Sequence, residues 1–90
     1  EDDIDRTTEV LKAVFPAFRN QHKDLLLDDP EVSGVMNLGA SGVEMRVTVK
    51  TLNEQHYGIE RALRKLIKET LDAHNIEIPL PQIVVNKPRE

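Results

Sequence analysis

The stretch that decides the fold is Asn75-Ile76-Glu77-Ile78-Pro79-Leu80-Pro81-Gln82-Ile83-Val84-Val85, near the end of the 90-residue chain. Two prolines enclose a single apolar residue, so the backbone between them cannot be helical. Asn75 stands where an amphipathic helix has to stop, and asparagine tolerates the left-handed conformation that ends many helices. The stretch therefore predicts the end of a helix, a stiff extended elbow and a final strand over residues 82–87.

The helix before this elbow is predicted over residues 54–74. Its apolar residues recur at helical spacing and its charged residues fall on the opposite face. The expected buried stripe consists of Ile59, Leu63, Leu66, Ile67, Thr70 and Leu71. The expected solvent face consists of Glu60, Arg61, Arg64, Lys65, Lys68 and Asp72.

A β-hairpin is predicted upstream of that helix. The second strand alternates cleanly, with one face formed by Val43, Met45, Val47 and Val49 and the other by Glu44, Arg46, Thr48 and Lys50. The first strand, over residues 32–38, is weakened by Gly34, and Gly39-Ala40-Ser41-Gly42 is the turn. One apolar and one polar face favour an antiparallel sheet that helices cover on one side.

The first segment predicts another helix, with Asp3 as its N-cap. Its apolar stripe consists of Ile4, Val10, Leu11, Val14, Phe15, Phe18 and Leu25. Pro16 lies inside this pattern, where it removes a helical hydrogen bond. A kink is favoured over a break, because the stripe continues through Phe18.

The element order is helix, strand, strand, helix, strand, in a single domain over residues 1–90. The expected fold class is α+β: a ferredoxin-like split βαβ sandwich that lacks its first strand (αββαβ), with two helices on one face of a mainly antiparallel sheet. In that plan the first strand separates the last strand from Val43–Lys50. Either the last strand pairs directly with Val43–Lys50, or strands of two copies pair across a two-fold axis. The Pro79–Pro81 elbow limits how far the last strand can shift, which favours a dimer.

Composition excludes several classes of function. The net charge of −4 opposes nucleic-acid binding, and only 3% of the residues are aromatic. Without cysteine there is no disulfide, thiol nucleophile or zinc–thiolate site. No apolar run approaches the roughly 18 residues of a membrane span. Because the chain starts at Glu1 rather than methionine, we interpret it as a segment of a longer protein.

No set of residues predicts chemistry, so catalytic, cofactor-binding and metal-binding residues are all expected to be none. The histidines are isolated in the sequence: His22, His56 and His74. The acidic start, Glu1-Asp2-Asp3 with Asp5, lacks the spacing and the glycine of a calcium loop. The basic residues of the second helix alternate with acidic ones, which favours a solvated face over an anion site. His74 is expected to help cap its helix.

Four motifs together resemble one known family. They are the start Asp3-Ile4-Asp5, the hairpin Leu38-Gly39-Ala40-Ser41-Gly42-Val43-Glu44-Met45-Arg46-Val47, the helix residues Tyr57, Leu66, Ile67 and Lys68, and the close from Asn75 to Val85. In this order and spacing they resemble the cytoplasmic C-terminal α/β domain of the small-conductance mechanosensitive (MscS-like) ion channel family.

The resemblance implies a parent channel in the cell membrane of a prokaryote, which opens under bilayer tension and releases solutes and ions on hypo-osmotic shock. In that family the subunits form a heptamer, and the α/β domains build a cytoplasmic cage with side portals. The chain would then be a cage and assembly domain, without enzymatic activity or cofactor. It would bind no nucleic acid and would reach the membrane only through other parts of the protein.

Two other functions remain open from the residues alone. A ferredoxin-like regulatory module would bind a small molecule and dimerise through its sheet, and only Gly39 and Gly42 suggest a ligand loop for it. An acylphosphatase-like enzyme would need an anion cradle before the first helix. That region is acidic here, which is the wrong sign for phosphate.

Overall fold

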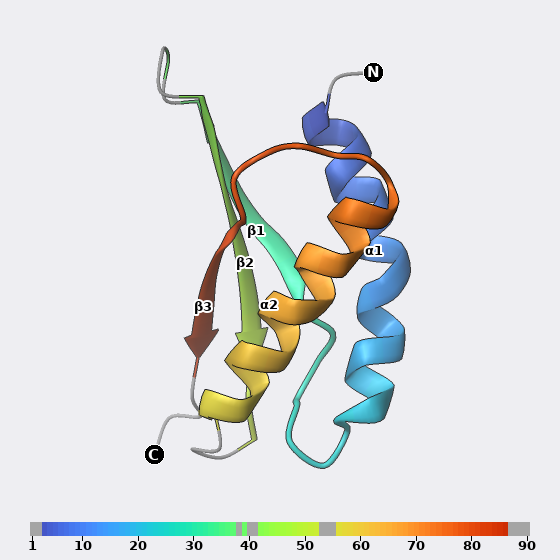
Figure 1. The fold of residues 1–90 in the computed structure, drawn as a ribbon. Coiled ribbons are helices and arrows are strands. Elements are labelled where there is room, and N and C mark those ends of the chain that lie inside the picture. The colour runs from blue at the N-terminus through green and yellow to red at the C-terminus, as the bar shows by residue number, and fades with distance from the viewer. Residues whose placement is uncertain (1–2, 38, 40–41, 53–55, 87–90) are drawn as a thin grey trace.

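The computed structural model describes residues 3–37, 39, 42–52 and 56–86, with the backbone alone at residues 3, 37, 43, 56 and 57. The elements follow in the order α1 (Asp3–Gln21), β1 (Glu31–Asn37), β2 (Val43–Lys50), α2 (His56–Ala73) and β3 (Gln82–Asn86). This is the predicted order, and every predicted element is present (Figure 1).

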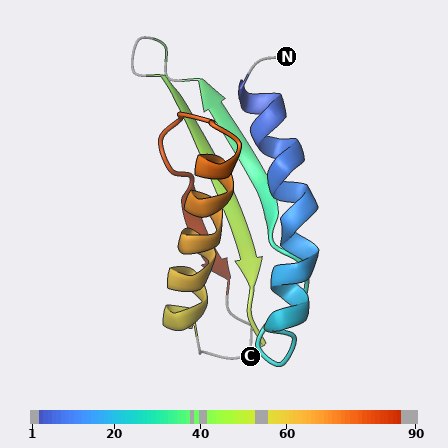
Figure 2. The same cartoon turned by 45° about the vertical axis from the view of Figure 1, so that its right-hand side comes forward.

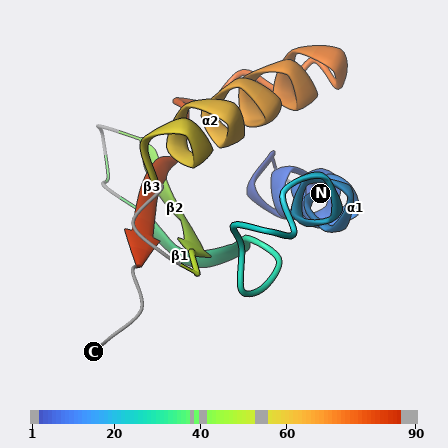
Figure 3. The same cartoon turned by 90° about the horizontal axis from the view of Figure 1, so that it is seen from below.

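The three strands form one mixed sheet in the order β1-β2-β3. β1 and β2 are antiparallel, whereas β2 and β3 are parallel and in unbroken register from Arg46 opposite Gln82 to Lys50 opposite Asn86. Both helices lie on the same face of this sheet (Figures 2 and 3). The α+β class and the αββαβ arrangement are thereby confirmed.

The place of the last strand differs from the favoured expectation. β3 pairs directly with β2, which is the alternative that we did not favour, so the Pro79–Pro81 elbow does not prevent this shift of the last strand. The elbow over residues 75–81 can span roughly 20 Å when extended, which is enough to carry the chain from the end of α2 to the neighbouring strand position. Pairing there satisfies backbone groups of β2 that would otherwise lack partners.

The hairpin between β1 and β2 closes as predicted. Gly42 N donates a hydrogen bond to Gly39 O at 3.0 Å. The backbone φ angles of Gly39 and Gly42 are 67° and 99°. Residues that have a Cβ adopt such angles only with strain. In β1 the register shifts between Val32 and Gly34, so Ser33 forms a β-bulge.

α1 continues through Pro16 without a break, which excludes the break that was the alternative to a kink. Pro16 is exposed, and Leu11, Phe15 and Phe18 face the core as predicted. The helix ends at Gln21, however, so Leu25 lies beyond it in a turn.

The chain after α1 pairs with the end of β2. Leu26 and Thr51 form an antiparallel bridge, flanked by hydrogen bonds from Leu27 N to Lys50 O at 2.9 Å and from Leu52 N to Leu25 O at 2.7 Å. Leu26 is 1% exposed, which makes it a core residue that the helical pattern did not reveal. This short ladder fixes the C-terminal end of α1 against the sheet.

The end of α2 is a Schellman motif. Asn75 has a φ of 56°, its N–H donates to Asp72 O at 3.2 Å, and Ile76 N donates to Leu71 O at 2.9 Å. Ile76 is buried beside Leu71, in the apolar contact that accompanies this motif. The left-handed conformation predicted for Asn75 is therefore confirmed, and it turns the chain into the elbow.

The core lies between the sheet and the two helices. The predicted stripe of α2 is buried, apart from the half-buried Leu66, and so are Met45, Val47 and Val49 on the apolar face of β2. The side chain of Val43 lies outside the described residues. The buried hydrophobic residues are Leu11, Phe15, Phe18, Leu26, Met45, Val47, Val49, Ile59, Leu63, Ile67, Leu71 and Ile76.

Candidate functional site

The histidines do not converge in the part of the chain that the structure describes. His22 packs its ring against Phe18, with centroids 4.5 Å apart, and His74 is exposed at the end of α2. The side chain of His56 lies outside the described residues, as do Glu1 and Asp2 of the acidic start. Among the described residues, no group of three or more His, Cys, Asp or Glu side chains could hold a metal ion.

Three basic residues of α2 form ion pairs along the helix. Arg64 contacts Glu60 at 2.7 Å, Lys68 contacts Asp72 at 3.2 Å, and Lys65 lies 3.9 Å from Glu69. All of these side chains are at least one-third exposed, so each pair adds only a few tenths of a kcal/mol. The exposure of these side chains agrees with the solvent face predicted for α2.

A positively charged side chain of α1 contacts the C-terminal end of α2. The Arg6 guanidinium donates a hydrogen bond to His74 O, although the two residues are 68 positions apart. A positive charge is favourable at this end of a helix dipole. We expected His74 to assist this cap, but the contact uses its main-chain carbonyl, and no sequence pattern pointed to Arg6.

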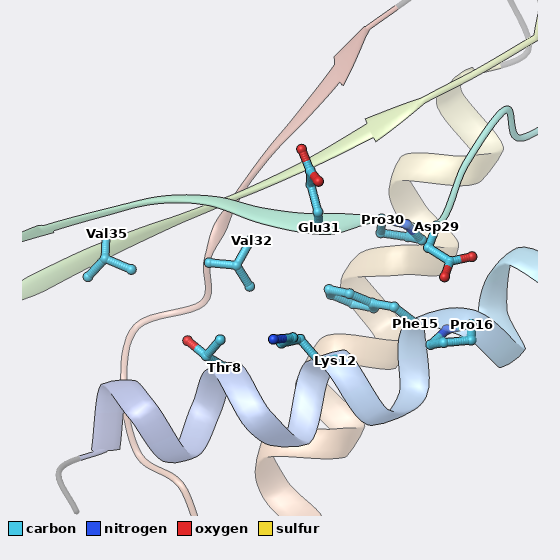
Figure 4. A pocket seen from close by; sticks show the side chains of 9 residues that line it. All are labelled: Thr8, Lys12, Phe15, Pro16, Asp29, Pro30, Glu31, Val32 and Val35. Carbon is cyan, nitrogen blue, oxygen red and sulfur yellow. The ribbon is translucent and has the colours of Figure 1, made fainter.

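A groove of about 470 Å³ runs between α1 and the start of β1. Its lining residues are Thr8, Lys12, Phe15, Pro16, Asp29, Pro30, Glu31, Val32 and Val35 (Figure 4). Phe15 and Val32 face each other across its floor, and Lys12 extends along the wall beside Thr8 (Figure 4). The groove is apolar below and sparsely charged at the rim.

This groove suits packing rather than catalysis. Its charged members are Lys12, Asp29 and Glu31, and Glu31 points away from α1 (Figure 4). A reaction would require a nucleophile, acid or base aimed at a common point, and this lining brings none together. Apolar side chains of a neighbouring surface could instead fill the space above Phe15 and Val32.

A second groove, of about 490 Å³, lies on the outer side of the two helices. Small and apolar residues form its floor, with charged residues from α2 at the rim. Its lining residues are Ala13, Val14, Ala17, Phe18, Gln21, His22, Ala62, Lys65, Leu66 and Glu69. Like the first groove, it combines apolar surface with a few charged or polar side chains.

Several large apolar side chains are about half exposed. They are Leu27, Val35, Met36, Leu52 and Leu80, with exposed fractions of 45–51%. Leu27 and Leu52 flank the ladder formed by Leu26 and Thr51, whereas Val35 and Met36 follow each other in β1. Neither α1 nor α2, the helices of the described region, is long and apolar enough to cross a membrane.

Fold and surface together define a small α+β domain with two surface grooves, one between α1 and β1 and one between α1 and α2. A model of the family described as "Mechanosensitive ion channel MscS, C-terminal" matches residues 1–78. The chain therefore belongs to this family of mechanosensitive channel C-terminal domains. No solved structure matches it.

Two curated relatives match almost the whole chain. A "Small-conductance mechanosensitive channel" of Caldanaerobacter subterraneus subsp. tengcongensis is 28% identical over 85 residues, which is 94% of this chain and 30% of the relative. An "Uncharacterized MscS family protein" of Archaeoglobus fulgidus is 32% identical over 84 residues, which is 93% of this chain and 28% of the relative. The chain thus spans under a third of the length of these relatives.

Proposed function

We propose that this chain is the cage and assembly domain of a mechanosensitive channel that releases solutes and ions on hypo-osmotic shock. It would lie on the cytoplasmic side of a prokaryotic cell membrane, as one domain over residues 1–90 of a longer subunit. The observation that carries the proposal is the match of the channel family over residues 1–78. The similarity to a small-conductance mechanosensitive channel over 94% of the chain supports it.

The surface of the domain is compatible with a structural role. Contacts between copies need apolar area that neighbours can cover, and the domain exposes about half of Leu27, Met36 and Leu52. Seven copies around the channel axis, as the family resemblance implies, would place each domain between two neighbours. The groove between α1 and β1 would give such a neighbour a concave surface.

The charged residues of α2 fit a wall that faces solution. Its three ion pairs leave little net charge on that face, so the field near the wall is weak beyond a Debye length of roughly 8 Å. Solutes of either sign could pass such a wall without being held. In this proposal the domain is not an enzyme, binds no cofactor or nucleic acid, and contributes assembly and shape.

A binding experiment distinguishes the channel function from the alternative, a regulatory module that binds a small molecule. Titration calorimetry of the chain with amino acids and with nucleotides should give no saturable binding at micromolar concentrations. A ligand that did bind there would favour the regulatory module instead.

The osmotic role is tested in cells. A bacterial strain without its own tension-gated channels would express the full-length protein that carries this domain and then be diluted from high into low salt. We expect survival to rise well above that of cells with an empty vector. Equal survival, with the protein present in the membrane fraction, would contradict the proposed release of solutes.

A further inference from the structure

The elbow after α2 presents an apolar side chain from a stiff segment of backbone. Leu80 stands between Pro79 and Pro81, and it is 45% exposed. Its surroundings are held in place, because Pro81 is buried and Ile78 packs against the core. The two prolines restrict the backbone around Leu80. Little conformational freedom is therefore lost when this side chain enters the surface of another molecule.

The groove between α1 and β1 lies at the other border of the sheet. Its apolar members include Phe15, Val32 and Val35. β1 and β3 are the outer strands of the sheet in the described part of the chain, and β2 lies between them. α1 packs against β1, whereas Leu80 leads into β3 (Figures 2 and 3). A groove at one border and an exposed leucine at the other can join identical copies head to tail.

Leu80 and the groove lie at a similar height along the strands. Val35 is opposite Met45 in the pairing of β1 with β2, and Gln82 is opposite Arg46 in the pairing of β2 with β3. Because Leu80 precedes Gln82 by two residues, it lies within roughly 7 Å of the level of Val35. Both halves of a head-to-tail contact must lie at one height along the axis of a closed ring, since a rise would give an open helix. The two surfaces meet this condition when the axis runs along the strands.

The charges beside the two surfaces are of opposite sign. Lys12 extends along the wall of the groove (Figure 4), and Glu77 is an exposed residue of the elbow. The ion pairs found among the described residues lie within α2, so neither Lys12 nor Glu77 has one there. Of the acidic lining residues, Glu31 points away from α1 and Asp29 lies at the end of the groove away from Val35 (Figure 4). An approaching carboxylate is therefore attracted to Lys12.

We propose that Leu80 inserts into the groove between α1 and β1 of the next copy in the ring, above Phe15 and Val32 of the partner subunit. Glu77 then pairs with Lys12 of the partner subunit at the rim. The contact joins two different surfaces, so it repeats from copy to copy around the axis until the ring closes. This inference rests on the proposed function, which supplies a ring of seven subunits, and it names residues that join them.

Cysteine cross-linking in the full-length channel tests the contact. The 90 residues contain no cysteine, and any cysteine elsewhere in the protein would be replaced by serine. Under mild oxidation, two cysteines form a disulfide only when their backbones lie close together. The double variant Leu80→Cys/Val35→Cys should therefore give a ladder of linked subunits, up to seven, on a denaturing gel. Each single variant should give monomer alone, because its cysteine meets no second cysteine.

Leu80→Cys/Met36→Cys is the matched control. Met36 follows Val35 in β1 and is exposed to a similar extent, but neighbouring residues of a strand point to opposite faces of the sheet. The control should give no ladder. A ladder as strong as that of Leu80→Cys/Val35→Cys would overturn the contact, and so would a ladder from either single variant.

Charge reversal at the rim tests the position of Glu77. In the cross-linking background, Lys12→Glu and Glu77→Lys each bring like charges together, so each should lower the rate of cross-linking about threefold. Both changes in one protein restore opposite charges and should restore the rate. Misfolding could not produce such a recovery. Equal rates in all four proteins would contradict the pairing at the rim.

The cross-linking result also separates this contact from the channel role. If Leu80→Cys/Val35→Cys gives no ladder, although the same protein elutes as an oligomer and protects cells on dilution into low salt, the contact is wrong and the channel role stands. A full-length protein that is monomeric and does not protect cells would contradict the proposed function and this contact with it.

Discussion

Arg6, near the start of α1, donates a hydrogen bond to the main-chain carbonyl of His74 at the end of α2. The contact joins the beginning of the first helix to the end of the second, across 68 residues of sequence. It places a positive charge where the dipole of α2 is negative. It also holds the two helices together at the point where the chain turns into the elbow that leads to β3.

Loss of this contact should lower stability slightly. Because Arg6 is exposed, we expect Arg6→Ala to reduce the free energy of unfolding by about 0.5 kcal/mol, the magnitude typical of exposed charge–dipole contacts. Urea unfolding measures this change. Arg61→Ala, at an exposed position of α2, is the control and should have a smaller effect. Equal effects would mean that the contact with His74 contributes nothing.

A buried hydroxyl in α1 should be dispensable. Thr7 is 0% exposed, and its Oγ1 atom makes no hydrogen bond. Thr7→Val keeps the shape and removes an unsatisfied polar atom, so we expect stability to rise by about 1 kcal/mol. Thermal unfolding of the two proteins measures the difference.

Thr8→Val is the matched control for that change. The Thr8 hydroxyl donates to Ile4 O at 3.0 Å, so its removal should leave stability unchanged or lower it. A Thr7→Val protein that melts below the wild type would show that the Thr7 hydroxyl has a partner.

The left-handed residue at the end of α2 should tolerate glycine but not alanine. Asn75 has a φ of 56°, where a Cβ without a compensating polar group is unfavourable by about 1 kcal/mol. We expect Asn75→Ala to lose about that much and Asn75→Gly to stay close to the wild type. Chemical unfolding of the three proteins should give that order, and equal stability of both variants would contradict it.

The signals that predicted the fold correctly were local ones. The alternation of β2, the helical stripe of α2 and the proline elbow after Asn75 each depend on neighbouring residues, and each is present in the structure. The pairing of β3 with β2 and the bridge between Leu26 and Thr51 depend on where distant segments meet, which no local pattern reports. The groove above Phe15 was missed for the same reason, because its walls come from α1 and from the residues around Pro30.

The alternation of apolar and polar residues along β2 also predicts how a charged substitution on either face changes the stability of the domain. Val47 is 0% exposed, and Val47→Asp would bury a carboxylate without a partner, at a cost of about 4 kcal/mol or more. That cost approaches the whole stability of many small domains, so we expect the variant to be largely unfolded. Circular dichroism and thermal melts measure this.

Thr48→Asp is the neighbouring control. Thr48 is half-buried on the other face and donates to Ser33 Oγ, so its replacement should cost only about 1 kcal/mol. If both variants unfolded equally, the assigned faces of β2 would be wrong.

Patch-clamp recording tests most directly whether the chain is a working domain of a tension-gated channel, as we propose. The full-length protein would be reconstituted in liposomes, and current would be recorded while suction stretches the membrane. We predict a conductance that opens with tension in the wild type and in Thr48→Asp, and that is lost in Val47→Asp because the domain no longer folds. A full-length protein that passes no current under stretch up to membrane rupture would contradict the claim.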